Sequence, residues 1–299
     1  MLDFKHITVS DREKVQRHTF ACEYRNCDLA FANLFVWQFL YDTQIAFDDN
    51  FMYVKYRYHN KLYYMLPVGK GDLIKAIDTI IEDSTFENQR FCLQGLSPKM
   101  KACVEKLLPD KFCFSSNRDY CDYLYLRKDL AELTGKRFQS KRNHINQFKR
   151  NYPNYEFLEI TPKIVPQCLE LEWLWESKNI NPQEEITLEA ERKAITNAFE
   201  NYQALQLSGG ALRVDNKIVA FTFGSPISWQ TFDVAVEKAD TQIVGAYTVI
   251  NNEFAKRISS SFIYLNREED LGLEGLRKAK LSYQPVDILE KFTAHPITP

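Results

Sequence analysis

The sequence has no long hydrophobic run, and this absence limits the class of protein. The longest apolar stretch, Leu29 to Tyr41, is too short to span a bilayer and contains Asn33 and Gln38. The first residues, MLDFKHITVSDREK, contain no apolar segment of the kind found in signal peptides. We therefore expect no transmembrane segment, a cytoplasmic location, and a buried core helix at 29–41.

The chain also lacks the cysteine spacings of metal sites and disulfide frameworks. Its seven cysteines are an odd number, no two form a CxxC pair, and no pair of histidines lies nearby. Irregular cysteines of this kind are typical of a reducing compartment. The sequence therefore predicts no metal site and no disulfide framework.

Neither sign of charge is in excess. The chain has 38 Lys and Arg against 40 Asp and Glu, a formal net charge of -2. Whole-chain charge therefore gives no argument for binding to nucleic acid or to an anionic membrane, and any such binding must be local. The length of 299 residues exceeds the size at which one core usually stops growing, which favours two domains.

The first half shows an α+β pattern. A hairpin is expected at 51–66 with its turn at His59 and Asn60, followed by helices at 72–82 and 97–108 and by strands near 91, 112 and 123. Residues 129–150 are helical and basic in pattern, and Pro153 ends them. We expect an N-terminal domain at 1–128, a basic linker helix at 129–152 and a C-terminal domain at 153–299 that carries the active site.

The second half follows the element order of GNAT-superfamily acyltransferases. Its pattern predicts a strand at 155–160, helices at 164–175 and 188–202, three antiparallel strands within 205–236, a helix at 245–258, a strand at 262–265, a short helix at 272–279 and a last strand from Leu281. The starts of the two halves, DFKHIT and EFLEIT, are alike, which favours related halves. The expected fold is two tandem GNAT-like domains with mixed central sheets flanked by helices.

The densest polar segment is NREEDLGLEGLRKAKLSYQP, from Asn266 to Pro285. It follows a short apolar strand, and ligands often bind beyond the carboxyl ends of strands. Arg267 and Arg277 suit a carboxylate or phosphate, and Lys280 suits a carbonyl or phosphate. The structural alternative is a capping box of Asn266 and Glu269, a helix cap at Asp270, and glycines that allow close packing.

Two carboxylates lie on the neighbouring strand, WQTFDVAVEKAD. Because side chains alternate across a sheet, Asp233 and Glu237 are expected to share a face. A partly desolvated carboxylate suits the base that deprotonates an incoming ammonium. The alternative is the polar face of an exposed sheet.

The turn after this strand leads into a helix start, which can hold a phosphate or stabilise an oxyanion. Gln242, Gly245 and Ala246 fit the coenzyme A signature Q/RxxGxG/A, whereas Tyr247 stands where that signature needs a small residue. Coenzyme A binding is therefore in doubt. The alternative is an ordinary helix capped by Asp240 or Thr241.

A basic segment precedes the second half. Residues 135–150, GKRFQSKRNHINQFKR, hold six Lys or Arg and no acid, and a helix there would align Phe138, Ile145 and Phe148 in an apolar stripe. A solvated linker helix is one interpretation. The other is a rim that grips RNA phosphate or an anionic head group.

Several of these motifs together resemble a known family. The segments VEKAD at 236–240, GAYTVINNEFA at 245–255, the polar segment at 266–285, KRNHINQFKR at 141–150 and FANLFVWQ at 31–38 resemble a bacterial family related to the C-terminal domain of phosphatidylglycerol lysyltransferases. The resemblance implies a tandem GNAT-like fold akin to the Fem transferases. It also implies aminoacyl-tRNA as a donor rather than acetyl coenzyme A.

We expect an acyltransferase that moves an aminoacyl or acyl group onto an amine or hydroxyl of a small-molecule, lipid or peptide acceptor. Asp233 or Glu237 would act as base or ammonium anchor, and Lys280 with the Gly245 helix start would stabilise the oxyanion. Substrate-binding residues are expected at Lys238, Tyr247, Asn266, Arg267, Asp270, Arg277 and Tyr283. Acyl-CoA would bind at Gln242, Gly245 and Ala246, and tRNA at the helix from Lys136 to Arg150. The alternatives are an acetyl-CoA-dependent N-acetyltransferase and a non-catalytic binding module.

Overall fold

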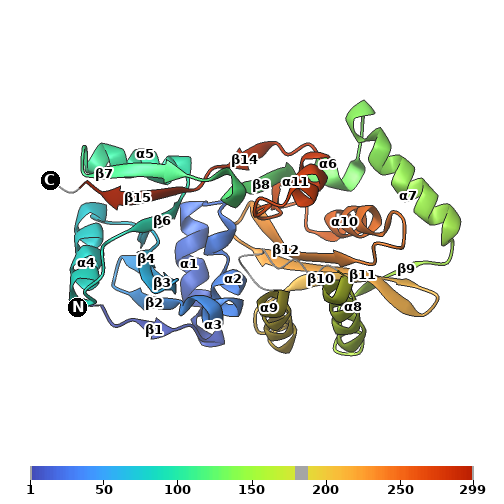
Figure 1. The fold of residues 1–299 in the computed structure, drawn as a ribbon, viewed down its shortest axis with the longest axis horizontal. Helices are drawn as coiled ribbons and strands as arrows, with labels where there is room; N and C mark the ends of the chain where they lie inside the picture. Colours follow the sequence, from blue (N-terminus) through green and yellow to red (C-terminus); the bar gives the residue numbers. More distant parts are fainter. Residues whose placement is uncertain (1, 179–187, 298–299) are drawn as a thin grey trace.

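The computed structural model describes residues 2–178 and 188–297. Two sheets lie side by side along the long axis of the molecule, and helices cover both (Figure 1). The α+β class and the mixed sheets expected from the sequence are confirmed.

The first sheet contains most strands of the N-terminal half. Its order is β1-β2-β3-β4-β6-β15-β7, and β5 pairs with β3. The bounds are β1 Lys5–His6, β2 Gln44–Phe47, β3 Phe51–Tyr58, β4 Lys61–Tyr64, β5 Val68–Gly69, β6 Leu93–Leu96, β7 Phe112–Ser116 and β15 Phe292–Pro296. The expected hairpin turn is present, because His59 and Asn60 both adopt positive φ.

The second sheet contains most strands of the C-terminal half. Its order is β14-β8-β13-β12-β11-β10-β9. The bounds are β8 Asp122–Leu126, β9 Glu156–Glu159, β10 Ser208–Val214, β11 Lys217–Pro226, β12 Thr231–Ala239, β13 Tyr264–Asn266 and β14 Asp287–Leu289. Parallel pairing joins β12 to β13, and the other pairs of this sheet are antiparallel.

The two sheets exchange strands. Strand β8, from the N-terminal half, pairs with β13 and β14 in the second sheet. Strand β15, from the end of the chain, pairs with β6 and β7 in the first. The hydrogen bonding therefore crosses the domain boundary expected at residue 128.

Helices divide between the sheets and their faces (Figure 1). The first half contains α1 Arg12–Cys22, α2 Phe31–Val36, α3 Gln38–Tyr41, α4 Leu73–Phe86 and α5 Pro98–Leu107. On the second sheet, α8 Val165–Lys178 and α9 Leu188–Glu200 lie on one face; α6 Arg127–Glu132, α7 Gln139–Asn151, α10 Ala246–Arg257 and α11 Glu274–Leu281 lie on the other. Short 3-10 turns occur at Val9–Asp11, Cys27–Leu29, Arg118–Tyr120 and Lys136–Phe138.

In the described part of the chain, the buried hydrophobic residues form three clusters on the faces of the two sheets. One core cluster runs from the first sheet, with Tyr64 and Ile77, onto the α8 and α9 face of the second sheet, with Ile195 and Phe221. Two smaller clusters fill the α10 face of the second sheet. The continuous cluster couples the two sheets in addition to their exchanged strands.

Some local predictions are confirmed and two are wrong. The apolar stripe of α7 is buried as expected, with Phe138, Ile145 and Phe148 in one cluster. The single helix expected at 29–41 is instead a 3-10 turn and two short helices that meet at Trp37. No strand begins at Leu281, because α11 continues to that residue. A turn follows, in which the Tyr283 and Gln284 N–H groups bond back to the carbonyls of Lys280 and Leu281.

The exchange of strands leads to a prediction about unfolding. Because each sheet contains a strand from the other half, we expect both sheets to lose structure in one cooperative transition. Urea titrations followed by far-UV circular dichroism and by tryptophan fluorescence should give the same midpoint. Two separate midpoints would contradict this expectation.

Candidate active site where strands β12 and β13 separate

A bulge in β12 fixes the geometry of the site. Phe223 of β11 pairs with Val236, and Ser225 pairs with Asp233. Between these two pairs, one residue of β11 therefore lies opposite two residues of β12. An extra residue in one strand reverses which face the following side chains take. On its other side, β12 pairs with β13 as far as Asp233 and Asn266, and no further pair follows.

The bulge places the two predicted carboxylates on opposite faces. Asp233 contacts Asn33 of α2, whereas Glu237 contacts Asn251 of α10. The prediction that Asp233 and Glu237 share a face is therefore wrong, because it assumed regular alternation along β12. Glu237 cannot assist Asp233 directly, and each carboxylate needs a separate account.

Asp233 forms a carboxyl pair with Glu268. The side-chain amide of Asn33 donates to Asp233 Oδ2 at 3.2 Å and to Glu268 Oε1 at 2.8 Å. Asp233 is 1% exposed, and its Oδ1 has no hydrogen-bond partner among the described residues. Burial and the neighbouring carboxylates raise the pKa of Asp233 well above its usual range, and burial with Glu269 raises the pKa of Glu268 to about 8. At neutral pH the pair therefore retains a proton.

Sequence reasoning missed both partners of Asp233. In the sequence, Asn33 is a polar interruption of the apolar stretch at 29–41, and Glu268 is one of several charged residues in the polar segment at 266–285. A lone amide in an apolar run was the signal for Asn33, since a buried amide needs hydrogen-bond partners. Glu268 carried no separate signal.

Asn266 and Lys280 hold the backbone around Glu268. Asn266 accepts from the Glu268 N–H at 2.7 Å and donates to Asp122 Oδ2 at 2.8 Å. The Lys280 ammonium donates to the backbone carbonyls of Arg267 and Glu269, on either side of Glu268, which has φ +53. Burial lowers the pKa of Lys280. Both side chains therefore support a strained turn.

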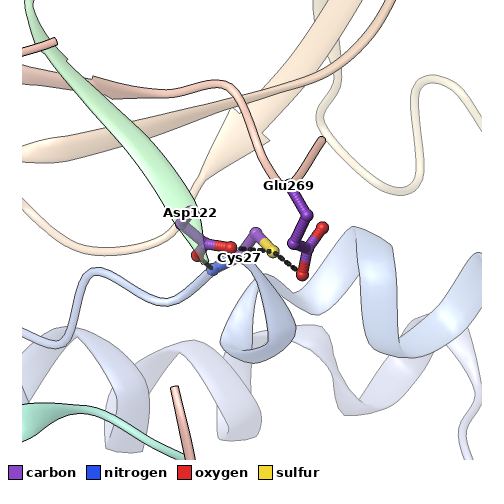
Figure 2. A group of neighbouring side chains, drawn as sticks. All are labelled: Cys27, Asp122 and Glu269. Carbon is purple, nitrogen blue, oxygen red and sulfur yellow. Dashed lines mark hydrogen bonds between the residues drawn. The ribbon is translucent and has the colours of Figure 1, made fainter. Parts of the chain in front are cut away.

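A buried ionic network borders this turn. Figure 2 shows the side chains of Cys27, Asp122 and Glu269 converging. One sulfur or carboxylate oxygen atom from each lies within 4.8 Å of the other two. The Lys291 ammonium lies among them, 2.9 Å from Asp122 Oδ1 and in contact with Glu269. Burial opposes its charge, but Asp122 and Asp28 raise the pKa of Lys291 well above its usual range. Because an ammonium already takes the place of a cation, these three residues do not fit a metal ion.

On the α10 face, Glu237 of β12 pairs with Arg267, which follows the end of β13. Its Oε1 accepts from Arg267 Nη2 at 2.8 Å, and its Oε2 accepts from Asn251 Nδ2 at 2.9 Å. The Arg267 guanidinium also lies 4.8 Å from the ring centroid of Tyr283. Glu237, Arg267 and Tyr283 are thus brought together, on the face opposite Asp233.

Lys238 and Tyr247 belong to a different group. The Lys238 ammonium lies 2.9 Å from Glu191, 3.5 Å from Glu172 and 3.4 Å from the ring centroid of Trp175. The Trp175 indole N–H donates to the Tyr247 hydroxyl at 2.9 Å. Burial raises the pKa of Glu172 to about 7 and that of Tyr247 to about 12. This group joins Lys238 of β12 and Tyr247 of α10 to α8 and α9, and it includes neither Asp233 nor Glu268.

Asp270 and Arg277 pair with each other. Arg277 bonds both oxygens of Asp270, at 2.7 and 2.9 Å, and also reaches Asp119 at 2.7 Å. Tyr123 donates to Asp270 at 2.6 Å. Burial opposes ionisation, but these hydrogen bonds lower the pKa of Asp270 to about 2. The two predicted substrate residues therefore have a structural role in closing the loop 267–277.

The predicted phosphate turn is covered by α7. Gly245 has φ +90 and begins α10, and a Cβ there would lie 2.7 Å from the carbonyl oxygen of His144. The glycine is thus required by packing against α7. Gln242 is exposed, the Ala246 N–H bonds to Ile243, and Asp240 accepts from the Gln242 N–H rather than capping α10.

Substitution of Gly245 tests this packing. We expect Gly245→Ala to lower the free energy of unfolding by about 1–3 kcal/mol, because of its positive φ and the contact with His144. Gly275, inside α11, would gain a Cβ with nothing within 4 Å, so Gly275→Ala should be neutral or stabilising by up to about 1 kcal/mol. Urea denaturation measures both. Equal effects of the two variants would contradict this explanation.

The carboxyl pair predicts a dependence of stability on pH. A carboxyl with a raised pKa keeps a proton in the folded state that the unfolded chain has lost, so stability declines as pH rises from about 4.5 to about 8. Glu268→Gln removes this contribution and should flatten the decline, as should Asp233→Asn. Unfolding free energies measured at intervals across that range test it. Variant and wild-type curves of equal slope would show that the pair does not carry the proton.

Comparisons with known proteins show where this fold occurs. A conserved protein of unknown function from Bacteroides thetaiotaomicron VPI-5482 is 52% identical, with a TM-score of 0.96 over 99% of this chain and 100% of that one. L-PGS from Bacillus licheniformis is 15% identical, with a TM-score of 0.67 over 95% and 91% of the two chains. FemX is 8% identical, with a TM-score of 0.59 over 99% and 97%. The last two show likeness of fold, and the expected tandem GNAT-like fold akin to Fem proteins is confirmed.

A shorter match and a family model complete the comparison. An uncharacterised protein of Mycoplasmoides gallisepticum is 25% identical over 173 residues, which are 57% of this chain and 54% of that protein. The match therefore spans about half the length of that relative. In the described part of this chain, no helix has the length and apolar character needed to cross a membrane. The family model for the phosphatidylglycerol lysyltransferase C-terminal region matches residues 20–295, and the chain therefore belongs to this family.

Proposed function

We propose that the protein transfers an aminoacyl or acyl group onto an amine or hydroxyl, with the carboxyl pair of Asp233 and Glu268 as base or ammonium anchor. Family and fold support an acyltransferase-like function. One observation carries the assignment of residues: two carboxyl groups share the amide of Asn33, and Asp233 Oδ1 has no partner among the described residues. A buried, unpartnered acceptor suits an incoming N–H or O–H group.

The proposed reaction is a simple acyl substitution. The acceptor nitrogen or oxygen forms a bond to the acyl carbon, and the bond from that carbon to the donor's oxygen or sulfur breaks. The acceptor loses a proton to the carboxyl pair, and the departing alkoxide or thiolate takes one up. A pair with raised pKa values can carry this proton near neutral pH.

The supporting residues take roles that differ from the expected ones. Lys280 is a positioning residue in this proposal, because its ammonium fixes the carbonyls beside Glu268. The start of α10 is not used for the oxyanion, because α7 packs against Gly245. The same packing favours aminoacyl-tRNA over acyl-CoA as the donor.

The donor, the acceptor class and the cytoplasmic location stay predictions. A small molecule, a lipid or a peptide remains the proposed acceptor. Binding of tRNA along α7 also stays a proposal, supported by the exposed side chains of Lys136, Lys149 and Arg150.

Transfer assays on matched variants test the proposal. The protein would be incubated with a mixture of aminoacyl-tRNAs radiolabelled on the amino acid, and with vesicles and peptidoglycan precursors as acceptors. We expect Asp233→Asn and Glu268→Gln to lower the transfer rate by about 10²–10⁴-fold, the usual worth of an acid-base group. Glu132→Gln changes an exposed carboxylate on α6 and should keep the wild-type rate.

Circular dichroism and melting temperature would confirm that each variant folds. Full activity in Asp233→Asn would contradict the assigned role of the pair. Absence of transfer by the wild-type protein with every donor, including acetyl coenzyme A, would contradict catalysis and favour a binding module of the same fold.

A further inference from the structure

Two cations share one aromatic ring on the α10 face of the second sheet. The Lys141 ammonium of α7 lies 3.6 Å from the ring centroid of Tyr283, and the Arg267 guanidinium lies 4.8 Å from the same centroid. Tyr283 is 5% exposed and follows α11. The three residues come from different elements, and we call them the cationic cluster.

The cationic cluster has unused hydrogen-bonding capacity. Arg267 Nη2 donates to Glu237, but Arg267 Nη1 is buried and has no partner among the described residues. The Lys141 ammonium donates to Ser282 Oγ at 2.6 Å, which leaves further N–H groups of its three. Buried guanidinium donors are normally paired, and their best partners are oxyanions.

The charges of the cationic cluster are not balanced. Among the described residues, the carboxylate placed beside these cations is Glu237, and its two oxygens are taken by Arg267 and Asn251. Burial and the charge of Arg267 lower the pKa of Lys141 to about 8. Two like charges therefore stand close together, and one carboxylate, that of Glu237, pairs with Arg267. A bound anion would relieve the repulsion between the two cations.

A purely structural role does not account for this arrangement. The bond from Lys141 to Ser282 links α7 to α11, but a neutral side chain would make that link without the repulsion from Arg267. The other basic side chains of α7 are either bonded to backbone carbonyls or exposed to solvent. Arg142 donates to the carbonyls of Leu133 and Gly135, and Lys149 is exposed, 5.9 Å from the ring centroid of Tyr155.

We propose that Lys141 and Arg267 bind an oxyanion of the phosphate class over the ring of Tyr283. The planar donor edge of Arg267 suits two oxygens of one phosphate or sulfate, and Lys141 adds a point charge. This site lies on the face of the sheet opposite the Asp233 and Glu268 pair, so it goes beyond the proposed function. Anion binding there can be measured without turnover.

Sulfate is the probe for this site, because it stays fully ionised across the pH range of interest. Isothermal titration at constant ionic strength, with chloride as the balancing ion, should show saturable binding to the wild-type protein. We expect Lys141→Met to weaken binding by about tenfold or more, the usual effect of losing one charge-assisted contact. Lys141→Arg should keep most of the affinity, and Lys128→Met, which changes an exposed lysine of α6, should match the wild type.

The pH profile gives a second readout. Sulfate affinity should fall between about pH 7 and about pH 9 as Lys141 loses its charge. Arg267 stays charged, because its partner Glu237 raises the pKa of the guanidinium against the effect of burial, and Tyr283, whose pKa burial raises to about 12, stays neutral in that range. In Lys141→Met the affinity should no longer depend on pH.

The source of the phosphate is tested by competition. Glycerol 1-phosphate as a monoester and dimethyl phosphate as a diester would be titrated against sulfate, and the tighter competitor identifies the form of ester. No saturable sulfate binding beyond chloride, or equal affinity in Lys141→Met and wild type, would overturn the proposal. Asp233→Asn should bind sulfate normally, so failure of the proposed reaction and failure of this site are distinguishable.

Discussion

The extra residue in β12 is the constraint on which the candidate site depends. Because three steps on β12 oppose two on β11, the face of the side chains reverses between Asp233 and Val236. The pairing of β12 with β13 stops at the same level, after Asp233 and Asn266. Without the bulge, Asp233 and Glu237 would project from the same face. With it, one carboxylate faces α2 and the other faces α10.

The turn after β13 is held in place by the contact between the two halves. Asn266 bonds to Asp122 of β8, a strand that the N-terminal half contributes to the second sheet. Glu269 joins the ammonium of Lys291, just before β15 enters the first sheet. Glu268 lies between Asn266 and Glu269, so the position of its carboxyl group depends on contacts with both exchanged strands, β8 and β15. A buried network of this kind is rigid only while each charge keeps its partner.

Much of the fold could be predicted from the sequence, because helices and strands leave periodic patterns of apolar residues. The apolar stripe of α7 and the three antiparallel strands of the second half followed from spacing alone. The exchange of β8 and β15 could not, because pairing between distant strands leaves no local pattern. The bulge was not predicted either, because its extra residue lies in β12, which contains no glycine or proline. The glycine at this level, Gly224, lies on the facing strand β11, where a Cβ would collide with the Asp233 carbonyl.

The sequence indicated which part of the chain forms the candidate site better than it indicated what each residue there does. Asp233, Asn266 and Arg267 do lie where the pairing of β12 with β13 stops. Asp270, Arg277 and Lys280 looked equally suited to a ligand, but their charges bind one another or nearby backbone. A sequence shows which charges are present, whereas burial decides which of them must be paired inside the protein. Asn33, which lies 200 residues away in the chain, could be linked to Asp233 only through the fold.

The α2 face and the α10 face of the second sheet carry different charged groups where the pairing of β12 with β13 stops. The α2 face holds two carboxyl groups that retain a proton, and the α10 face holds two cations beside one carboxylate. Arg267 and Glu268 are adjacent in sequence, yet Arg267 contacts Glu237 on one face and Glu268, with its positive φ, contacts Asn33 on the other. Because Lys280 holds the carbonyl between Arg267 and Glu268, a shift of that single peptide would change both faces at once.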